Sequence, residues 1–362
     1  MSSNRFFVDP DITKAETLPS SFYTDSTIFE KLKSIFLNSY HFIGDVNLVP
    51  LPGQSYPFVL LESYLNEPLV LVRNNEDEIN CFSNVCTHRG NIVVQNPGKL
   101  RNLQCLYHGR IFDLNGQFKR MPEFENVQNF PRACDNLHKF DVKCLGPFIF
   151  CGLNQNLDFR LILAEINKKV SFLPLEQFTY RPSLSKDYLV NCHWALYCDN
   201  YLEGFHIPFV HGGLNKTLDY EKYNTEISEY SVLQVGYAEK NSIHFDLPKS
   251  SIDYGQNIAA YYYWLFPNMM FNFYPWGLSI NIVKPIKTNL TKVEFRSYVW
   301  DQKKRNSGAG SILNKVELED EAIVENVQKG VRSRFYKNGR FSPKMEKGVH
   351  HFHKLISNFL VL

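Results

Sequence analysis

Residues 86–109 read CTHRGNIVVQNPGKLRNLQCLYHG and hold two cysteines and two histidines. Cys86 and His88 form a Cys-x-His pair, and Cys105 and His108 form a Cys-x-x-His pair after sixteen intervening residues. A glycine follows each pair within two residues. Thiolate and imidazole are side-chain ligands of zinc and of iron–sulfur clusters. The four residues therefore predict one metal site built from two loops.

Two kinds of metal site fit these ligands. Zinc takes mixed cysteine and histidine ligands, but more often with other spacings such as Cys-x-x-Cys. In a Rieske [2Fe–2S] centre, two cysteines hold one iron and two histidines hold the other. A glycine beside each pair favours this centre, because backbone amides can then approach the sulfides and tune the cluster. Four unrelated buried residues are the third interpretation. We expect the Rieske centre.

The composition sets limits on the class of protein. A chain of 362 residues is long enough for two domains, and 44% hydrophobic with 21% charged residues is typical of a globular protein. A net charge of +2 argues against a nucleic-acid binder. We see no secretory signal and no apolar stretch of membrane-spanning length. We therefore expect a cytoplasmic protein with no membrane contact, whose eight cysteines are free or metal-bound.

Patterns along the chain predict three segments. Residues 1–37 form an N-terminal arm that ends in a short helix. Residues 38–160 alternate short apolar runs with turn formers, which predicts an all-β domain. Residues 161–362 combine strands over 222–300 with an amphipathic helix over 315–337. The second domain is therefore a sheet with helices packed on it, and the fold class is α+β.

A second cluster of ligands lies in residues 198–212, CDNYLEGFHIPFVHG. Asp199, Glu203 and His206 are spaced to share one face of a helix, which we expect to span residues 194–211. His211 would point away from that face in a straight helix. Pro208 bends the predicted helix and brings both imidazoles toward one point. Two histidines with one carboxylate make the facial triad of non-haem Fe(II). Asp199 and Glu203 are the candidate catalytic residues.

An acidic run over residues 317–321, ELEDE, could complete this triad. Glu317, Asp320 and Glu321 are three and four positions apart on the predicted helix, beside apolar residues, so at least one of them should border the buried face. The alternative is a solvated acidic face, which is the usual meaning of a charge run.

Both motifs resemble those of the Rieske non-haem iron oxygenases, in the catalytic alpha subunit. The loops C-T-H-R-G and C-L-Y-H-G match that family's cluster loops, except that Leu106 and Arg110 replace a proline and a tryptophan. The runs N-Y-L-E-G-F-H and E-x-V-Q-K-G and the tail G-V-H-H-F-H are similar to the branch that includes choline monooxygenase, glycine betaine demethylase and carnitine oxygenase.

The resemblance implies the remaining roles. The third iron ligand is placed on Asp320, with Glu317 and Glu321 as alternatives. Glu203 corresponds to the carboxylate that links His108 of one subunit to His206 of the next in a head-to-tail homotrimer. The catalytic domain is expected to have the helix-grip fold, a sheet wrapped around helices. An NAD(P)H-dependent flavin or ferredoxin-type reductase is the expected electron donor, and O₂ the co-substrate.

The substrate is less defined by the sequence. The run over 258–286 is rich in aromatic residues, of which two or three could form a cation–π cage for a quaternary ammonium group. We considered these candidates: Tyr261, Tyr263, Trp264, Phe266, Phe271, Phe273, Tyr274 and Trp276. The alternative for each is packing in the sheet core. Other functions that fit are an aromatic acid hydroxylase or O-demethylase, a Rieske electron carrier without catalysis, and a zinc-stabilised binding protein. The lone histidines His193 and His244 and the histidine-rich tail are expected to be structural.

Overall fold

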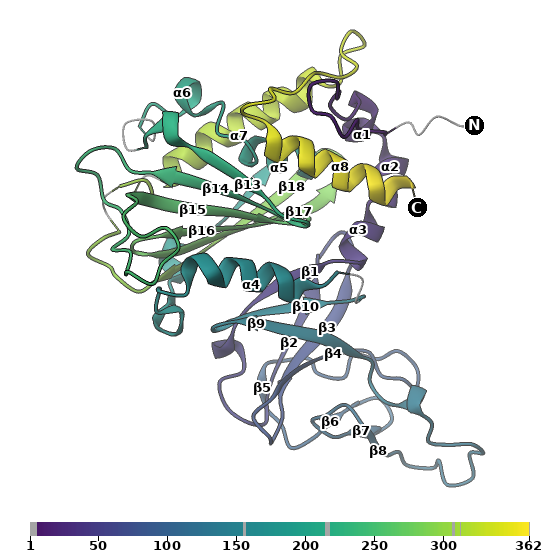
Figure 1. Ribbon diagram of the computed structural model, residues 1–362. Coiled ribbons are helices and arrows are strands. Elements are labelled where there is room, and N and C mark those ends of the chain that lie inside the picture. Colours follow the sequence, from purple (N-terminus) through teal and green to yellow (C-terminus); the bar gives the residue numbers. More distant parts are fainter. Residues whose placement is uncertain (1–5, 155–156, 214–217, 306–307, 312, 362) are drawn as a thin grey trace. The chain divides into compact units, whose positions relative to one another are not determined.

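The computed structural model describes residues 6–154, 157–213, 218–305, 308–311 and 313–361. The chain divides into two compact units (Figure 1). One consists of Leu37–Phe159, and the other combines Met1–Phe36 with Arg160–Leu362. The N-terminal arm therefore belongs to the same unit as the C-terminal half of the chain.

The smaller unit is built from antiparallel strands. Seven of them form one sheet in the order β1-β10-β9-β4-β3-β2-β5, and β6, β7 and β8 form a second, small sheet. The strands are β1 (Tyr40–Asp45), β2 (Gln54–Leu60), β3 (Glu67–Arg73), β4 (Ile79–Ser83), β5 (Gly98–Lys99), β6 (Leu103–Gln104), β7 (Ile111–Phe112), β8 (Phe118–Arg120), β9 (Lys139–Leu145) and β10 (Phe148–Gly152).

A buried apolar cluster joins these two sheets. Val70 and Val72 of β3 and Phe82 of β4 pack with Phe112 of β7, and all four side chains are fully buried. The same cluster contains two of the predicted ligands, whose thiols are therefore anchored in the core of the unit. The predicted all-β character of this region is confirmed.

The larger unit is an antiparallel sheet in the order β11-β18-β17-β16-β15-β14-β13, with β12 also paired to β18. Its strands are β11 (Thr179–Tyr180), β12 (Lys186–Val190), β13 (Asn224–Ile227), β14 (Ser231–Tyr237), β15 (Ile258–Leu265), β16 (Met269–Tyr274), β17 (Gly277–Lys287) and β18 (Leu290–Val299). Its helices are α1 (Ser20–Thr24), α2 (Ser26–Lys31), α3 (Lys33–Leu37), α4 (Phe159–Val170), α5 (Trp194–Tyr201), α6 (Ile207–Val210), α7 (Leu313–Gly330) and α8 (Lys347–Val361).

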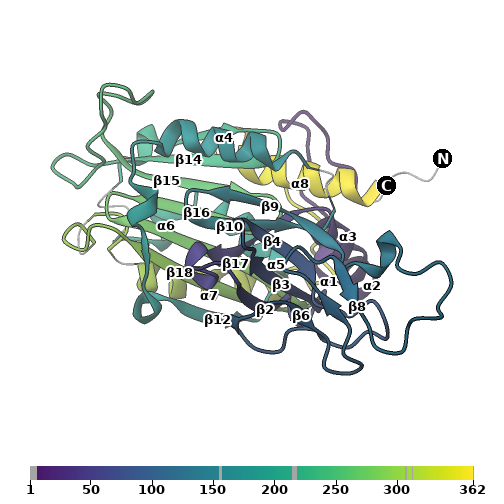
Figure 2. The ribbon, with the colours of Figure 1, turned by 90° about the horizontal axis from the view of Figure 1, so that it is seen from below.

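Helices cover both faces of this sheet. Helices α5, α7 and α8 lie over one face, whereas α4 lies along β14 and β15 on the other (Figures 1 and 2). Because side chains alternate between the faces of a strand, Tyr263 faces α4 and its neighbour Tyr262 faces α5 and α7. The α+β class is thus confirmed, with the site expected on the face covered by α5 and α7.

The N-terminal arm supports the first of these helices. Phe36 of α3 packs edge-on against Trp194, the first residue of α5, with ring centroids 5.1 Å apart. Trp194 is fully buried. None of the helices in the described residues combines the length and apolar composition needed to cross a membrane.

Candidate metal centres

The four predicted cluster ligands come together in the smaller unit. Cys86 and Cys105 are almost fully buried, with 3% and 2% of their surface exposed, whereas His88 and His108 are half-buried. The two rings meet edge to face, and their Nδ1 atoms lie 3.2 Å apart. The site therefore presents two thiols on its inner side and two imidazole nitrogens on its outer side.

The two ligand loops have the same backbone geometry. The amide of Cys86 donates to the carbonyl of Asn91 at 2.8 Å, and the amide of Cys105 donates to the carbonyl of Arg110 at 2.8 Å. The glycine four residues after each cysteine donates back to that cysteine's carbonyl and has a φ near +71°. L-residues rarely adopt this conformation. The glycines predicted beside each pair are thus required by the turn itself.

In the larger unit, the predicted long helix is two shorter ones. Helix α5 ends at Tyr201, and His206 and His211 flank the four-residue helix α6 on its two sides. The expected continuous helix with a bend at Pro208 is therefore wrong. Proline lies in the first turn of α6, where its fixed φ is favourable. The break comes earlier, after Tyr201, and in the segment that follows a Cβ on Gly204 would lie 2.8 Å from the ring of Tyr223.

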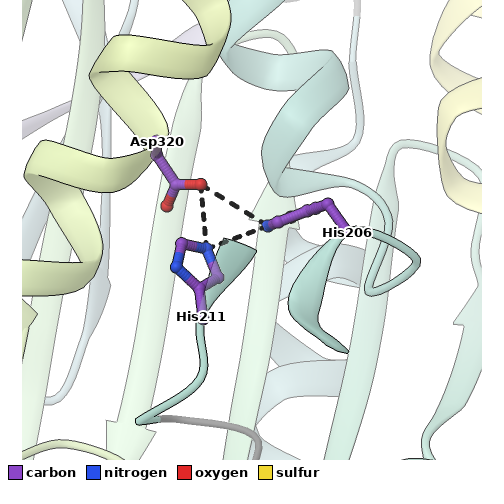
Figure 3. A group of neighbouring side chains, drawn as sticks. All are labelled: His206, His211 and Asp320. Atoms are coloured by element: carbon purple, nitrogen blue, oxygen red, sulfur yellow. Dashed lines mark hydrogen bonds and ion pairs between the residues drawn. The ribbon is translucent and has the colours of Figure 1, made fainter. Parts of the chain in front are cut away.

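The structure brings three of the predicted ligands to one point (Figure 3). Nε2 of His206 lies 3.1 Å from Nε2 of His211. Oδ1 of Asp320, from α7, lies 3.0 Å from Nε2 of His211 and 3.4 Å from Nε2 of His206. Two nitrogens and one oxygen therefore converge from two segments more than a hundred residues apart.

The Nδ1 atom of each histidine ring lies within hydrogen-bonding distance of a carboxylate. Oε1 of Glu203 lies 2.7 Å from Nδ1 of His206, and Oε2 of Glu319 lies 2.8 Å from Nδ1 of His211. Each carboxylate accepts a hydrogen bond from the protonated Nδ1 and so leaves Nε2 available as a ligand. Glu203 was among the residues predicted from the sequence, and Glu319 was not. The only signal for Glu319 was its position in the acidic run, next to Asp320.

The backbone also depends on Glu203. Its Oε2 accepts a hydrogen bond from the amide of His206 at 3.1 Å and another from the amide of Phe205. One side chain therefore fixes both the turn that precedes α6 and the ring of His206.

The carboxylates shift the pKa values of the group. Burial opposes charge on His206, but its hydrogen bonds to Asp320 and Glu203 outweigh burial and raise the pKa to about 9. For Asp320, burial favours the neutral form, yet the bonds to the two histidines lower the pKa of the carboxyl. The arrangement stabilises a positive charge between the two rings, as expected where a metal ion replaces a proton.

The two alternative ligands on α7 do not join the group of His206, His211 and Asp320. Glu317 is buried, and its Oε1 accepts a hydrogen bond from the hydroxyl of Tyr197 at 2.5 Å. Burial raises its pKa well above the usual range. Burial, with the nearby charges of Glu325 and Asp320, raises the pKa of Glu321 to about 7. The geometry therefore favours Asp320 over both.

Asp199 belongs to a different group. Its Oδ1 lies 2.9 Å from Nε2 of His353 on α8, and its Oδ2 accepts from the hydroxyl of Tyr23 on α1 at 2.8 Å. Nδ1 of His353 accepts from the amide of Leu18 at 3.1 Å. Asp199 is not among the described residues that line the cavity at the three ligands. We therefore assign it a structural role, in tying α5 to the arm and to α8.

A cavity adjoins the three ligands, between the sheet and helices α5 and α7. Its floor is a row of side chains from neighbouring strands: Gln234 pairs with Tyr262, Tyr262 with Asn272, and Asn272 with Ser279. Further aromatic rings come from the elements around this floor. The aromatic residues that line the cavity are Tyr197, Tyr201, Tyr223, Tyr262, Tyr274 and Phe295.

On β15, the two tyrosines predicted for the aromatic cage, Tyr261 and Tyr263, do not line the cavity. Of the candidates over residues 258–286, Tyr274 lines the cavity, and Tyr262, which we had not named, lines it too. Tyr261 faces the other side, where it stacks on Phe245 with ring centroids 5.4 Å apart. Tyr262 and Tyr274 meet edge to face at 5.8 Å and form a corner of the cavity wall.

The donor sets fit two different iron groups. Two thiols with two Nδ1 atoms match a Rieske [2Fe–2S] cluster, which needs two sulfur and two nitrogen ligands. Two Nε2 atoms with one carboxylate fit mononuclear Fe(II), which His206, His211 and Asp320 would hold and which would supply O₂ activation. A fold that carries both groups defines a Rieske-type oxygenase, an oxidoreductase.

Comparison with known proteins agrees with this class. Residues 174–360 match the family described as the ring hydroxylating alpha subunit (catalytic domain), and residues 47–131 match the Rieske [2Fe-2S] domain. The chain belongs to this family of Rieske oxygenase alpha subunits.

Its relatives include enzymes of the choline and carnitine monooxygenase branch. The chain is 30% identical to choline monooxygenase, chloroplastic, of Arabidopsis thaliana over 98% of this chain and 86% of that protein. It is 26% identical to the carnitine monooxygenase oxygenase subunit of Escherichia coli K12, over 95% and 94%. The crystal structure of the quaternary ammonium Rieske monooxygenase CntA with L-carnitine superposes with a TM-score of 0.74 at 20% identity, covering 96% of this chain and 97% of that chain.

Proposed function

We propose that this protein is the oxygenase component of a two-component monooxygenase that hydroxylates or N-demethylates a small quaternary ammonium compound. The relatives named for choline and carnitine support this substrate class. In such a reaction one oxygen atom of O₂ enters a C–H bond, and two electrons with two protons reduce the other atom to water. Hydroxylation beside the nitrogen yields a carbinol that releases an aldehyde or is oxidised further.

The observation that carries the proposal is the charge and aromatic content of the cavity. No lysine or arginine is among the described residues that line it, whereas Glu203, Glu317 and Asp320 are. A trimethylammonium group is stabilised by contact with the faces of tyrosine rings. A carboxylate substrate would have no lysine or arginine of the described lining as a partner, and its desolvation would be costly. The cavity therefore favours a cation over an aromatic acid.

A polar position on the floor complements the aromatic wall. Nε2 of Gln234 donates to the carbonyl of Tyr201 at 2.7 Å, while its Oε1 is buried and has no hydrogen-bond partner in the described part of the chain. Such an acceptor is available to a hydroxyl group of the substrate. Binding through the floor and the tyrosines would orient one C–H bond toward the three ligands.

The chain's own residues divide the remaining work. His206, His211 and Asp320 would hold Fe(II), and Cys86, Cys105, His88 and His108 the cluster, which together supply O₂ activation and single electrons. Glu203 and Glu319 keep Nδ1 of each histidine protonated, so that Nε2 faces the metal position. The apolar and aromatic wall excludes water from the reacting carbon.

We further propose that the oxygenase is a head-to-tail homotrimer that takes electrons from an NAD(P)H-dependent reductase. The likeness of the chain to an oxygenase subunit supports a separate reductase. Apolar side chains stand exposed at both centres: Leu106 with 72% of its surface exposed beside the cluster ligands, and Phe209 with 82% between the two iron-site histidines. Such side chains would be covered if one subunit's cluster loop met its neighbour's α6. None of the eight cysteines forms a disulfide, which supports a reducing, cytoplasmic location.

Ligand competition tests the substrate class. Choline and other trimethylammonium compounds should bind the iron-loaded protein and be oxidised with a reductase, with the aldehyde or carbinol product detected directly. Aromatic carboxylates such as benzoate should bind at least about tenfold more weakly. Equal binding of both classes would refute the proposal in favour of an aromatic acid substrate. Iron content separates an oxygenase, with three irons per chain, from an electron carrier with two.

A further inference from the structure

An arginine is buried directly behind the cluster loops. Arg110 follows the second loop, two residues after His108, and only 2% of its side chain is exposed. Its Nη2 donates to Oδ1 of Asp135 at 2.8 Å. Its Nε is buried and has no partner in the described residues. Burying a guanidinium costs desolvation free energy unless the charge is paired. Arg110 is therefore buried at an energetic cost that its pairing only partly offsets.

Three aromatic rings enclose the guanidinium. Its Cζ lies 4.9 Å from the ring centroid of Phe118, 5.4 Å from that of Phe130 and 5.7 Å from that of Phe112. Phe112 belongs to the same buried cluster as Cys86 and Cys105. The positive charge therefore lies on the inner side of the site, where the two thiols are anchored, and it is shielded from water.

One backbone oxygen connects both ligand loops to this arginine. The carbonyl of Asp135 accepts from Nη2 of Arg110 at 3.2 Å and from the hydroxyl of Thr87 at 2.8 Å. Thr87 stands between Cys86 and His88 in the first loop. Donors from both loops thus bond to the same backbone oxygen.

Asp135 itself is held rigidly. Its Oδ2 accepts from the amide of Arg132 at 2.8 Å, in a short turn of residues 133–135. The next residue, Asn136, accepts from the amide of Phe118 through Oδ1 at 2.8 Å. The partner of Arg110 is therefore part of the folded unit and not a mobile surface carboxylate.

We propose that Arg110, paired with Asp135, is a positioning residue that fastens the two cluster loops together and sets the reduction potential of the cluster. Reduction adds one negative charge to the cluster, and a fixed cation nearby stabilises that state. Asp135 acts in the opposite sense, because its carboxylate partly cancels the cation. The two halves of one ion pair therefore have opposite effects on the potential. This inference concerns the cluster alone and is independent of the substrate.

The test uses the full-length, cluster-loaded protein, with the midpoint potential followed by spectroelectrochemistry in visible light. Arg110→Gln should lower the potential, by about 59 mV for a tenfold fall in the ratio of reduced to oxidised cluster. Asp135→Asn should raise the potential, because it removes the negative half and keeps the backbone carbonyl. Arg110→Lys should hold the potential near the wild-type value but release acid-labile sulfide faster in the presence of a chelator.

Arg132→Gln is the matched control. The Arg132 guanidinium also lies within 3.9 Å of the Asp135 carboxylate, but its side chain is 69% exposed, so water screens its charge and the potential should stay unchanged. Shifts of the same sign in Arg110→Gln and Asp135→Asn, or no shift in either, would refute the electrostatic role. If Arg110→Gln does not accumulate as folded protein, Asp135→Asn decides alone: a raised potential supports the proposal, and an unchanged or lowered one overturns it.

Discussion

Glu203 and His206 are joined through the ring nitrogen that does not face the metal position. Oε1 of Glu203 lies 2.7 Å from Nδ1 of His206, while Nε2 of the same ring lies 3.1 Å from the second histidine of the site. The carboxylate therefore fixes the tautomer and the orientation of a ligand without occupying a ligand position. We therefore expect that a change at Glu203 can alter turnover without removing the metal.

Glu203→Gln should retain both iron groups and lower turnover by about 100-fold. The amide can still bond to Nδ1, so the ring stays in place, but its negative charge and the bridge proposed between subunits are lost. Iron analysis, acid-labile sulfide and product formation with a reductase provide the measurements. Glu319→Gln is the control, because it changes the equivalent bond to His211 and should cost only about tenfold. If Glu203→Gln keeps its turnover, Glu203 is not part of the electron path.

Asp320→Ala should lose the mononuclear iron and keep the red-brown cluster. Asp320 supplies the only carboxylate oxygen that lies within reach of both Nε2 atoms among the described residues. Iron content should fall from three to two per chain, with unchanged sulfide. Glu321→Gln is the matched control on the same helix, and it should keep all three irons. Full iron retention in Asp320→Ala would move the ligand to another residue.

Short motifs made the ligands predictable, because each motif places its residues on one local segment. Cys86, His88, Cys105 and His108 needed only the two loops. The helix with one buried edge left Glu317, Asp320 and Glu321 open, and the choice of Asp320 came from the family resemblance. Glu319 was missed because its role depends on where α6 lies relative to α7, and this is a tertiary relationship that no spacing within 317–321 records.

Two other errors have local physical causes. The helix break was assigned to Pro208, although proline is well tolerated in a first helical turn. Helix α5 instead ends at Tyr201, and the segment that follows it packs Gly204 closely on Tyr223. A strand was correctly predicted in the region of β15. Its three consecutive tyrosines, however, give no apolar–polar alternation, so nothing in the sequence showed which of them faced the cavity. The Arg110–Asp135 pair was invisible for a related reason, since it joins a loop to a turn twenty-five residues away.

Tyr262→Leu should weaken the binding of a quaternary ammonium compound by about tenfold. Tyr262 forms a corner with Tyr274, and each ring that faces a cation contributes about 0.5–2 kcal/mol. Binding can be followed by the fluorescence of Trp276, which stacks on Tyr274 with ring centroids 5.3 Å apart. Tyr262→Phe keeps the aromatic face and should bind nearly as well as the wild type.

A neutral ligand separates charge recognition from shape. 3,3-Dimethylbutan-1-ol has carbon in place of the nitrogen of choline, so it fills the same space without a charge. It should bind more weakly than choline to the wild type, and its affinity should change little in Tyr262→Leu. Equal losses for both ligands would show that the ring provides packing alone.

The stability of the larger unit should fall in acid because of His193. This residue is fully buried, accepts from the amide of Ala195 through Nδ1 and has its pKa lowered to about 3 by burial. Above pH 6.5 both the folded and unfolded states are neutral at this position, and it adds no pH dependence. Below pH 6.5 the unfolded state takes up a proton that the folded state does not, so stability falls by about 1.4 kcal/mol per pH unit.

Urea unfolding of wild type and His193→Asn at pH 7 and pH 5 measures this effect. Asparagine can still cap the helix but does not titrate. The variant should be less stable at pH 7, and the gap should narrow by about 2 kcal/mol at pH 5. A gap that stays constant would show that His193 is not the source of the acid sensitivity.

Phe209→Ser should weaken the proposed trimer. A phenylalanine with 82% of its surface exposed in α6 gains by burial against a neighbouring subunit, at about 25 cal/mol per Å² of apolar surface. Leu106→Ser, at the cluster loop, should have a similar effect. Because the two side chains are expected to meet across one interface, the double variant should lose less than the sum of the two single losses. Sedimentation velocity over a range of concentrations gives the dissociation constants for this cycle.

Phe335→Ser is the matched control, since Phe335 is 86% exposed on the segment after α7 and its replacement should leave assembly unchanged. Additive losses would place Leu106 and Phe209 at separate contacts, and a stable trimer in both single variants would place the interface elsewhere.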